Sequence, residues 1–375
     1  MVAPTDSAAP LALRGLDLDA LTLLCEELGE PRFRAEQLFR WLHRFGAAEW
    51  ARMSNLPKTL RATLAERAAL DPLQIDTLQT SNDGTRKLRL RCPSDGALIE
   101  SVLIPRLERD VQPSQHSATI GADDEAEKLT LCISSQVGCA LGCTFCATAT
   151  LGLSRNLQPE EIVDQVYRAN GVLGEGERIS NLVFMGMGEP LANLDRVLAA
   201  MGLLTHGQGL DMSPRRITVS TVGHVKGLRE LGQRMPQLGL AISLHATTDE
   251  LRSRLMPINR RWPLRELLAA LRAFPLPRRR RVTFEYMLLA GLNDTPADAK
   301  RLPKLLDRIP SKVNLLPFNP WRDDQPDFRR PTEDAIDEFA ERLRDKGLTV
   351  TVRQSRGLDI AAACGQLALD DTTLS

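Results

Sequence analysis

The sequence lacks an excess of charge, a long apolar run and a leader-like start. Its 48 Lys and Arg residues balance 48 Asp and Glu residues, and this net charge of zero argues against a generally adhesive polycation. No apolar run approaches membrane-spanning length. The opening residues, from Met1 to Asp6, contain no basic stretch followed by an apolar one, so we expect no signal peptide. We therefore predict a cytoplasmic protein that does not enter a membrane.

Cysteine is the residue whose distribution is uneven. The chain of 375 residues is long enough for one large domain and a smaller one. It holds seven cysteines, and four of them fall between positions 132 and 146. An odd and clustered set in a protein that is not secreted indicates metal or redox chemistry rather than structural disulfides.

Three of these cysteines, Cys139, Cys143 and Cys146, follow the spacing C-x-x-x-C-x-x-C directly after a strand-like run. Three thiolates leave one iron of a 4Fe-4S cluster without a protein ligand. The amino and carboxylate groups of S-adenosylmethionine (SAM) can chelate such an open iron, which the reductive cleavage of SAM requires. The spacing resembles the radical-SAM superfamily, and Phe145 could shield the cluster from water.

A structural zinc site is the alternative use of the same cysteines. Zinc needs four ligands, so Cys132 or a histidine would have to complete the set. The spacing is not that of a usual zinc knuckle.

Two small units are predicted before the main one. Residues 1–72 have a helical pattern, with Arg and Lys beside aromatic residues, which fits either an RNA-docking module or a helical cap with a solvated basic face. Residues 73–128 predict a β linker, with hairpin turns at Asn82-Asp83-Gly84 and Ser94-Asp95-Gly96 and a polar loop over 106–128.

From residue 129 to 358, apolar strand-like runs alternate with helical patterns, as in an α/β fold with a parallel sheet. Strands are expected at 129–133, 179–185, 217–220, 240–244, 282–288 and 313–316, and helices at 159–173, 193–205, 224–232, 263–273, 296–309 and 332–346. Six such units predict a partial (β/α)6 barrel. A final strand at 348–353 and a C-terminal tail at 359–375 follow it.

Sites in such barrels form where the strands end. The residues expected at that rim are Gly188, Glu189, Ser220, Ser243, Leu244, His245 and Asn319. Glycines let the backbone approach a ligand closely, and polar groups there can bind the ribose, carboxylate or adenine of SAM. Each residue alone is more often a turn, cap or core residue, so the prediction depends on the whole set.

Two further features each have two interpretations. Cys132 and Cys364 are either inert buried thiols or reactive ones, and Cys364 precedes a glycine in a stretch of small residues that could carry it to the barrel mouth. The arginines at 278–281 and at 252, 254, 260 and 261 are either solvated helix ends or phosphate contacts.

Four segments together carry a resemblance to a known family. The runs at 132–146, 184–190, 242–246 and 363–367 resemble the RlmN/Cfr family of radical-SAM RNA methyltransferases, and the likeness extends from about residue 16 to 368. It implies a radical-SAM barrel that methylates carbon 2 of an adenosine in the peptidyl-transferase centre of 23S rRNA. It also implies methylation of the adenosine 3′ of the anticodon in certain tRNAs.

The resemblance also implies residue roles. Carbon 2 of adenine is electrophilic and cannot attack a sulfonium methyl group. One SAM therefore methylates Cys364, a second SAM supplies a 5′-deoxyadenosyl radical that activates this methyl group, and Cys132 releases the product by forming a disulfide with Cys364. Glu100 matches the proton acceptor of the family, although a lone carboxylate on a strand would be expected at the surface.

The implied cofactors are one 4Fe-4S cluster on the three cysteines and two SAM molecules per turnover. The implied partners are 23S rRNA, tRNA and an external electron donor such as flavodoxin, and we expect a monomer. The connection from Pro105 to Leu129 is longer than usual for the family, and the short acidic tail after Leu367 puts any tail contact to RNA in doubt.

Three alternatives differ in chemistry. A Cfr-type enzyme would methylate carbon 8 of the same adenosine, and only overall likeness favours carbon 2. A non-catalytic, zinc-stabilised RNA-binding module would be colourless, whereas an iron–sulfur protein is brown. Radical-SAM enzymes that modify peptides usually carry further cysteine motifs, which this sequence lacks.

Overall fold

The computed structural model describes residues 10–70, 73–106, 127–320 and 328–369. Of the polar loop expected at 106–128, residues 107–126 lie outside this part. Within the described ranges, no helix combines the length and apolar character needed to cross a membrane.

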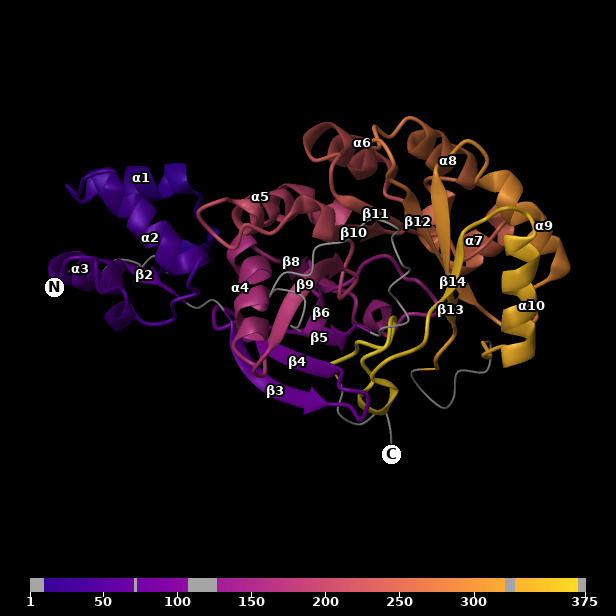
Figure 1. Ribbon diagram of the computed structural model, residues 1–375, viewed down its shortest axis with the longest axis horizontal. Coiled ribbons are helices and arrows are strands. Elements are labelled where there is room, and N and C mark those ends of the chain that lie inside the picture. Colours follow the sequence, from indigo (N-terminus) through magenta and orange to yellow (C-terminus); the bar gives the residue numbers. More distant parts are fainter. Residues whose placement is uncertain (1–9, 71–72, 107–126, 321–327, 370–375) are drawn as a thin grey trace, which may run out of the picture.

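A ten-stranded mixed sheet is the framework of the protein, in the order β14-β13-β12-β11-β10-β9-β6-β5-β4-β3 (Figure 1). The parallel strands are β6 (Glu127–Cys132), β9 (Glu177–Phe184), β10 (Ile217–Thr221), β11 (Gly239–Ser243), β12 (Val282–Leu288), β13 (Ser311–Pro317) and β14 (Val350–Val352). Antiparallel pairing adds β5 (Leu98–Pro105), β4 (Arg86–Arg91) and β3 (Gln74–Thr80). The carboxyl ends of the parallel strands meet at one edge, which is the mouth of the barrel.

Helices cover the outside of the parallel strands, as the strand–helix alternation predicts. They are α4 (Pro159–Asn170), α5 (Leu194–Thr205), α6 (Val225–Arg234), α7 (Asp249–Leu255), α8 (Leu264–Arg272), α9 (Pro296–Leu305) and α10 (Glu333–Arg344). The predicted partial (β/α)6 barrel is confirmed. Helix α7 was not predicted from the sequence, because a helix of seven residues is too short to show a clear apolar period.

The N-terminal segment forms three helices where its apolar pattern predicts them: α1 (Leu18–Glu27), α2 (Phe33–His43) and α3 (Lys58–Arg67). Asp17 caps α1 by accepting a hydrogen bond from the Ala20 amide at 2.8 Å. The short strands β1 (Leu11–Ala12) and β2 (Ala68–Ala69) pair in parallel and bring the two ends of this segment together.

The chain after β14 returns to the antiparallel end of the sheet (Figure 1, yellow). The Gly357 amide donates a hydrogen bond to the Asp83 carboxylate in the turn between β3 and β4, at 2.9 Å. Further on, the Gly365 carbonyl accepts a hydrogen bond from the Ala147 amide, at 2.8 Å, close to the cysteine loop. The tail therefore crosses the open side of the partial barrel.

A buried ion pair joins the N-terminal helices to the barrel. Arg14 and Asp164 of α4 are both fully buried and hydrogen-bonded to each other. Arg14 also donates to the Ala47 carbonyl at 3.0 Å and lies over the Tyr167 ring, 4.7 Å from its centroid. The second oxygen of Asp164 accepts the Leu73 amide at 3.1 Å. Arg168, one turn further along α4, also pairs with Asp164, at 3.2 Å, but it is partly exposed. Removing Arg14 therefore takes away the fully buried partner of the Asp164 carboxylate and leaves only the partly exposed one.

We expect Arg14→Met to lower the free energy of unfolding by about 3 kcal/mol, because the buried Asp164 carboxylate then keeps only the partly exposed Arg168 as an ion-pair partner. The double variant Arg14→Met/Asp164→Leu should recover most of this loss. Arg342→Met, which removes an exposed pair with Glu338 on α10, should change it by less than about 1 kcal/mol. Urea denaturation measures all three variants. Equal effects for Arg14→Met and Arg342→Met would contradict the assignment.

Candidate active site at the barrel mouth

A small hairpin presents the three closely spaced cysteines. Strands β7 (Gln136–Gly138) and β8 (Leu153–Asn156) pair in antiparallel fashion, and the 3-10 helix η5 (Ala147–Leu151) closes the loop between them. Gly138 has a φ of 73°, and a Cβ there would lie 1.8 Å from the Gly152 carbonyl oxygen. Only glycine allows this crossing. The sequence predicts a plain loop here, because strands of three and four residues are too short to show alternation.

The three thiols of this loop lie within electrostatic reach of one another. Burial raises the pKa of all three, that of Cys139 to about 11, and the charges of Cys139 and Cys146 raise the pKa of Cys143 further. Thiolates are soft ligands, and without a bound metal these three would repel one another. A polynuclear iron centre suits them because it disperses their negative charge. The donor set therefore fits a 4Fe-4S cluster with one iron left open.

The described residues contain no group of three His, Cys, Asp or Glu side chains arranged to hold a single metal ion. The irons of a 4Fe-4S cluster occupy separate corners, so its cysteine ligands stay farther apart than the four ligands of one zinc ion. The three cysteines of the loop also fall one short of the four ligands of a structural zinc site.

Apolar and aromatic side chains surround the loop on the barrel side. Phe145 is 7% exposed and forms a buried cluster with Cys143, Met256, Met287 and Phe318, among others. These side chains exclude water from one face of the loop. Phe145 also meets the His245 ring edge to face, with 4.9 Å between the ring centroids.

Gly186–Pro190 follows β9 and packs against the segment after β6. A Cβ on Gly188, whose φ is 96°, would lie 2.5 Å from the Gln136 side chain. The buried Glu189 carboxylate accepts hydrogen bonds from the amides of Leu191, at 3.0 Å, and Val222, at 2.9 Å. Burial raises the pKa of Glu189 to about 7, and these hydrogen bonds oppose the rise. Glu189 thereby connects the ends of β9 and β10.

The other expected rim residues lie at the ends of β10, β11 and β13. Ser220 and Ser243 are partly exposed, and Asn319 donates to the Ser355 hydroxyl at 2.6 Å. The Leu244 side chain is fully buried in the core, so only its backbone faces the mouth. His245 adopts a φ of 56°, and its Nδ1 accepts the Met287 amide at 3.0 Å. Burial lowers the pKa of His245 to about 3, so its ring is neutral.

Two charged residues of the barrel interior were missed or misplaced by sequence reasoning. Arg252, grouped there with solvated or phosphate-binding arginines, is fully buried and donates to the carbonyls of Val222, Ser243 and Leu244, at 2.6–3.1 Å. It holds the ends of β10 and β11 together and cannot contact phosphate. Glu285 of β12 was not singled out at all, because nothing in an apolar strand signals which face a carboxylate occupies.

Glu285 is 6% exposed, aligns with Ser243 in the neighbouring strand and accepts a hydrogen bond from Asn314 at 3.0 Å. Burial raises its pKa to about 7.

The structure brings Cys132 and Cys364 to the same region. Cys132 ends β6 and is buried, and desolvation raises its pKa to about 12. Part of the Cys364 residue is exposed to solvent, but protein atoms surround it closely. Desolvation of the thiol, together with the charges of Cys132, Glu285 and Cys146, raises its pKa to about 12. All seven cysteines are free thiols.

Glu100 is buried, at 2% exposure, and the expectation that it lies at the surface is wrong. Strand β5 has neighbours on both sides, β4 and β6, and the tail passes over it. Glu100 pairs with Lys87 at 3.4 Å and accepts the Leu369 amide at 3.4 Å. Burial raises the pKa of Glu100, and Lys87 opposes this rise.

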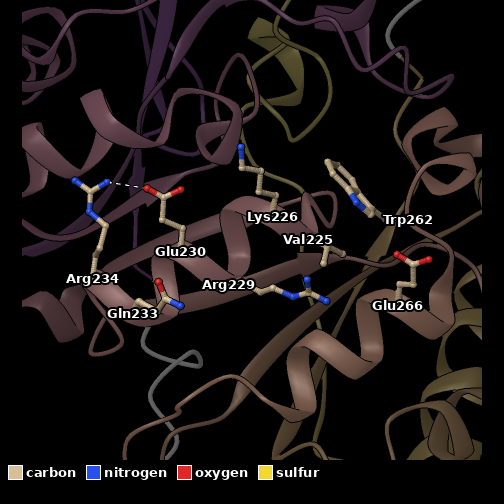
Figure 2. A pocket seen from close by; sticks show the side chains of 8 residues that line it. All are labelled: Val225, Lys226, Arg229, Glu230, Gln233, Arg234, Trp262 and Glu266. Atoms are coloured by element: carbon tan, nitrogen blue, oxygen red, sulfur yellow. Dashed lines mark hydrogen bonds and ion pairs between the residues drawn. The ribbon is translucent and has the colours of Figure 1, made fainter.

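A surface hollow lies apart from these residues (Figure 2). It is lined by Val225, Lys226, Arg229, Glu230, Gln233, Arg234, Trp262 and Glu266. None of the expected site residues is among them, and its mixture of cations and carboxylates gives it no clear preference for an anionic ligand.

Comparisons with known proteins agree with this geometry. Residues 11–70 match the model of the ribosomal RNA large subunit methyltransferase N-terminal domain, and residues 133–302 match that of the radical SAM superfamily. The chain is 50% identical over 355 residues to the dual-specificity RNA methyltransferase RlmN of Geobacter sulfurreducens, covering 95% of this chain and 91% of that one. For the protein of the same name from Anaeromyxobacter dehalogenans the identity is 49%, with 96% and 92% covered.

A solved structure of a radical SAM methyltransferase from Sphaerobacter thermophilus superposes with a TM-score of 0.84. It is 43% identical, and the match covers 96% of this chain and 99% of that one. Fold and cysteine loop thus define a radical SAM enzyme, whose cofactors are a 4Fe-4S cluster and SAM. The relatives match over nearly their whole length, and the chain belongs to the RlmN family of RNA methyltransferases.

Gly138→Ala should strongly reduce the iron bound after anaerobic reconstitution, because the new Cβ collides with the Gly152 carbonyl and distorts the hairpin that carries the cysteines. Gly142→Ala is the matched control. Its φ of 64° imposes a similar strain of about 1 kcal/mol, but the nearest atom, on Pro257, is 3.8 Å away. Iron and sulfide analysis should find near-normal content in the control only. Equal content in both variants would disprove the role assigned to Gly138.

Proposed function

We propose that this enzyme methylates carbon 2 of an adenosine in the peptidyl-transferase centre of 23S rRNA and of the adenosine 3′ of the anticodon in tRNA. The observation that carries the proposal is the meeting of two thiols, Cys132 and Cys364, with the cysteine loop and the buried Glu100. A single-displacement methyltransferase would need none of these groups. The family relatives are dual-specificity RNA methyltransferases by name, which supports both substrates.

Cys139, Cys143 and Cys146 are proposed to hold the cluster, which when bound supplies the electron for reductive cleavage of SAM. Gly188 and Glu189 would approach the amino group of SAM through the backbone. Ser220, Ser243, Leu244, His245 and Asn319 would position the rest of the molecule. For Leu244 this role is limited to backbone, and for His245 to a neutral ring, as their burial requires.

Cys364 is proposed to accept a methyl group from one SAM molecule, since a thiolate is a good nucleophile towards a sulfonium carbon. Its solvent exposure allows the thiol to meet both SAM and a substrate base. Two SAM molecules are thus used per turnover, one for this transfer and one for activation of the S-methyl group.

Glu100 is proposed to take the proton from carbon 2 of the adenine once the methyl-derived carbon has bonded there. That adduct is a radical, so one electron must leave together with the proton, and the cluster, left oxidised by the cleavage of SAM, would accept it. Burial raises the pKa of the Glu100 carboxyl above its ordinary value, which makes it a stronger proton acceptor, and the charge of Lys87 opposes this rise. The Cys132 thiolate would then attack the Cys364 sulfur. The carbon–sulfur bond breaks, the carbon takes a proton, and the disulfide that forms must be reduced by an external thiol.

We assign RNA docking to residues 1–72, a linking role to 73–128, the catalytic barrel to 129–358 and delivery of the methyl-carrying cysteine to 359–375. Exposed arginines and aromatic rings gather on the helical module at Arg32, Phe33, Arg40, Arg44 and Phe45. Such groups suit phosphate contact and stacking on RNA bases.

The two arginine clusters occupy opposite edges of the barrel. The exposed Arg254, Arg260 and Arg261 follow β11 and therefore lie on the side of the mouth, where they can meet RNA phosphates. The run 278–281 precedes β12 and lies at the opposite edge, away from the proposed site. A monomer in the cytoplasm with flavodoxin or a similar protein as electron donor completes the proposal.

The function is tested on 23S rRNA and tRNA from a strain without the gene. Reconstituted enzyme, which should be brown, is incubated with SAM and a reductant, and the digested nucleosides are separated by mass spectrometry. We expect 2-methyladenosine. Formation of 8-methyladenosine, or of neither product, would overturn the proposal.

Cys364→Ala should keep wild-type iron content and abolish RNA methylation, because no protein-bound methyl group remains. In the wild type, peptide mass spectrometry should find one added methyl group on Cys364. Methylated RNA from the variant would contradict the relay.

Cys132→Ala should trap the enzyme on its RNA substrate. Cys364 still carries the methyl group and can still become linked to the base, but no second thiolate is present to release it. A denaturing gel should show a nuclease-sensitive species of raised mass that is absent from Cys132→Ala/Cys364→Ala. Inactivity without any such species would mean that Cys132 has another role.

A further inference from the structure

The segment that carries Cys364 has little regular structure of its own. Between β14 and residue 369 the only helical turn is η9 (Leu358–Ile360), flanked by left-handed residues, Gly357 with a φ of 61° and Ala361 with a φ of 48°. Left-handed backbone is unfavourable for alanine and persists where surrounding contacts enforce it. Within the tail, the Gln366 amide donates to the Ala363 carbonyl at 3.0 Å and forms a tight turn around Cys364. Contacts with other elements must fix where this turn lies.

The turn between β3 and β4 supplies one half of this restraint. One Asp83 oxygen accepts the Thr85 amide of its own turn, at 2.9 Å, and the other accepts the Gly357 amide of the tail, also at 2.9 Å. The Asp83 carbonyl accepts a hydrogen bond from Arg356 at 3.3 Å. A Cβ on Gly357 would lie 2.8 Å from the Ala362 Cβ, which shows how closely the tail folds at this point.

The tail supplies the other half. One Asp359 oxygen accepts the Asn82 amide at 3.1 Å, and the other accepts the Ser81 hydroxyl. The hydrogen bonding is thus reciprocal: a carboxylate of the turn binds the tail, and a carboxylate of the tail binds the turn. Hydrogen bonds with these partners lower the pKa of both Asp83 and Asp359, so both carboxylates are ionised at neutral pH and bind as strong acceptors.

A second attachment follows directly after Cys364. The Gly365 carbonyl accepts the Ala147 amide at 2.8 Å, and the Leu367 carbonyl accepts the Thr148 hydroxyl at 2.7 Å. Gln366 donates to the Pro320 carbonyl at 2.9 Å, next to the end of β13. Cys364 therefore lies in a short arch that is fixed to the β3–β4 turn on one side and to the cysteine loop on the other.

We propose that Asp83 and Asp359 are positioning residues that hold the Cys364 arch at the barrel mouth, and that the β3–β4 turn is thereby part of the catalytic apparatus. The inference rests on the proposed function, in which Cys364 must meet SAM, the adenine and Cys132 in succession. Displacing a reacting atom by about 1 Å can lower a rate roughly 100-fold.

Asp359→Ala is the cleanest test, because the Asp359 side chain is directed to Ser81 and Asn82 and touches no reacting group. We expect kcat for RNA methylation to fall by roughly 10- to 100-fold, with KM for RNA, iron content and SAM affinity unchanged within about twofold. Asp359→Asn keeps one acceptor oxygen and should be intermediate. Asp337→Ala, which removes an exposed carboxylate on α10, should behave as wild type.

Two physical readouts separate positioning from other causes. In Asp359→Ala, amide hydrogen exchange in residues 356–369 should become faster, and so should alkylation of unmethylated Cys364 by iodoacetamide. Asp83→Ala should have the same effects with a larger change at Thr85. Wild-type kcat, or a lower kcat with unchanged exchange in the tail, would overturn the proposal. If the wild type itself makes no 2-methyladenosine, the proposed function fails. Unchanged hydrogen exchange and alkylation in Asp359→Ala would independently refute the positioning role of Asp83 and Asp359.

Discussion

The contact between the end of the chain and the cysteine loop is the interaction on which the rest of the site depends. Two hydrogen bonds, from Ala147 to Gly365 and from Thr148 to Leu367, bring Cys364 beside the loop that would hold the iron. The barrel alone provides a rim of strand ends, and the cysteine loop alone provides thiolates. The returning tail brings Cys364 near Cys132 at the end of β6, and its Leu369 amide reaches the buried Glu100 on β5.

Local signals in the sequence were sufficient for the barrel and for the set of candidate residues at its mouth. Alternating apolar runs predict strands and helices because each element buries one face, and parallel strands necessarily bring their carboxyl ends together. The spacing of Cys139, Cys143 and Cys146 is also local. The amino-acid sequence could therefore predict which residues lie at the strand ends around the mouth, although not what each of them contacts.

The features that escaped prediction depend on distant partners. Arg252 looks like any arginine of an amphipathic helix, and only the fold shows that three carbonyls at the ends of β10 and β11 surround it. Glu100 looks like a surface carboxylate until β4, β6 and the tail enclose it. Both are charged groups whose burial is stabilised by specific partners, and no apolar periodicity reports such pairs.

The hydrogen bonds between the β3–β4 turn and the tail also bear on the order in which parts of the protein fold during synthesis. Asp83 and Gly357 are 274 positions apart in the chain, so their contact closes a very long loop and forms late in folding. A nascent chain still attached to the ribosome can fold its N-terminal helices, the strands of the barrel and the metal-binding loop as they emerge. Until the segment from Gly357 to Leu369 has emerged, it lacks Cys364 and the hydrogen bonds that hold it. The cysteine loop can therefore form before the tail has been made, whereas the part of the site that includes Cys364 forms only after it.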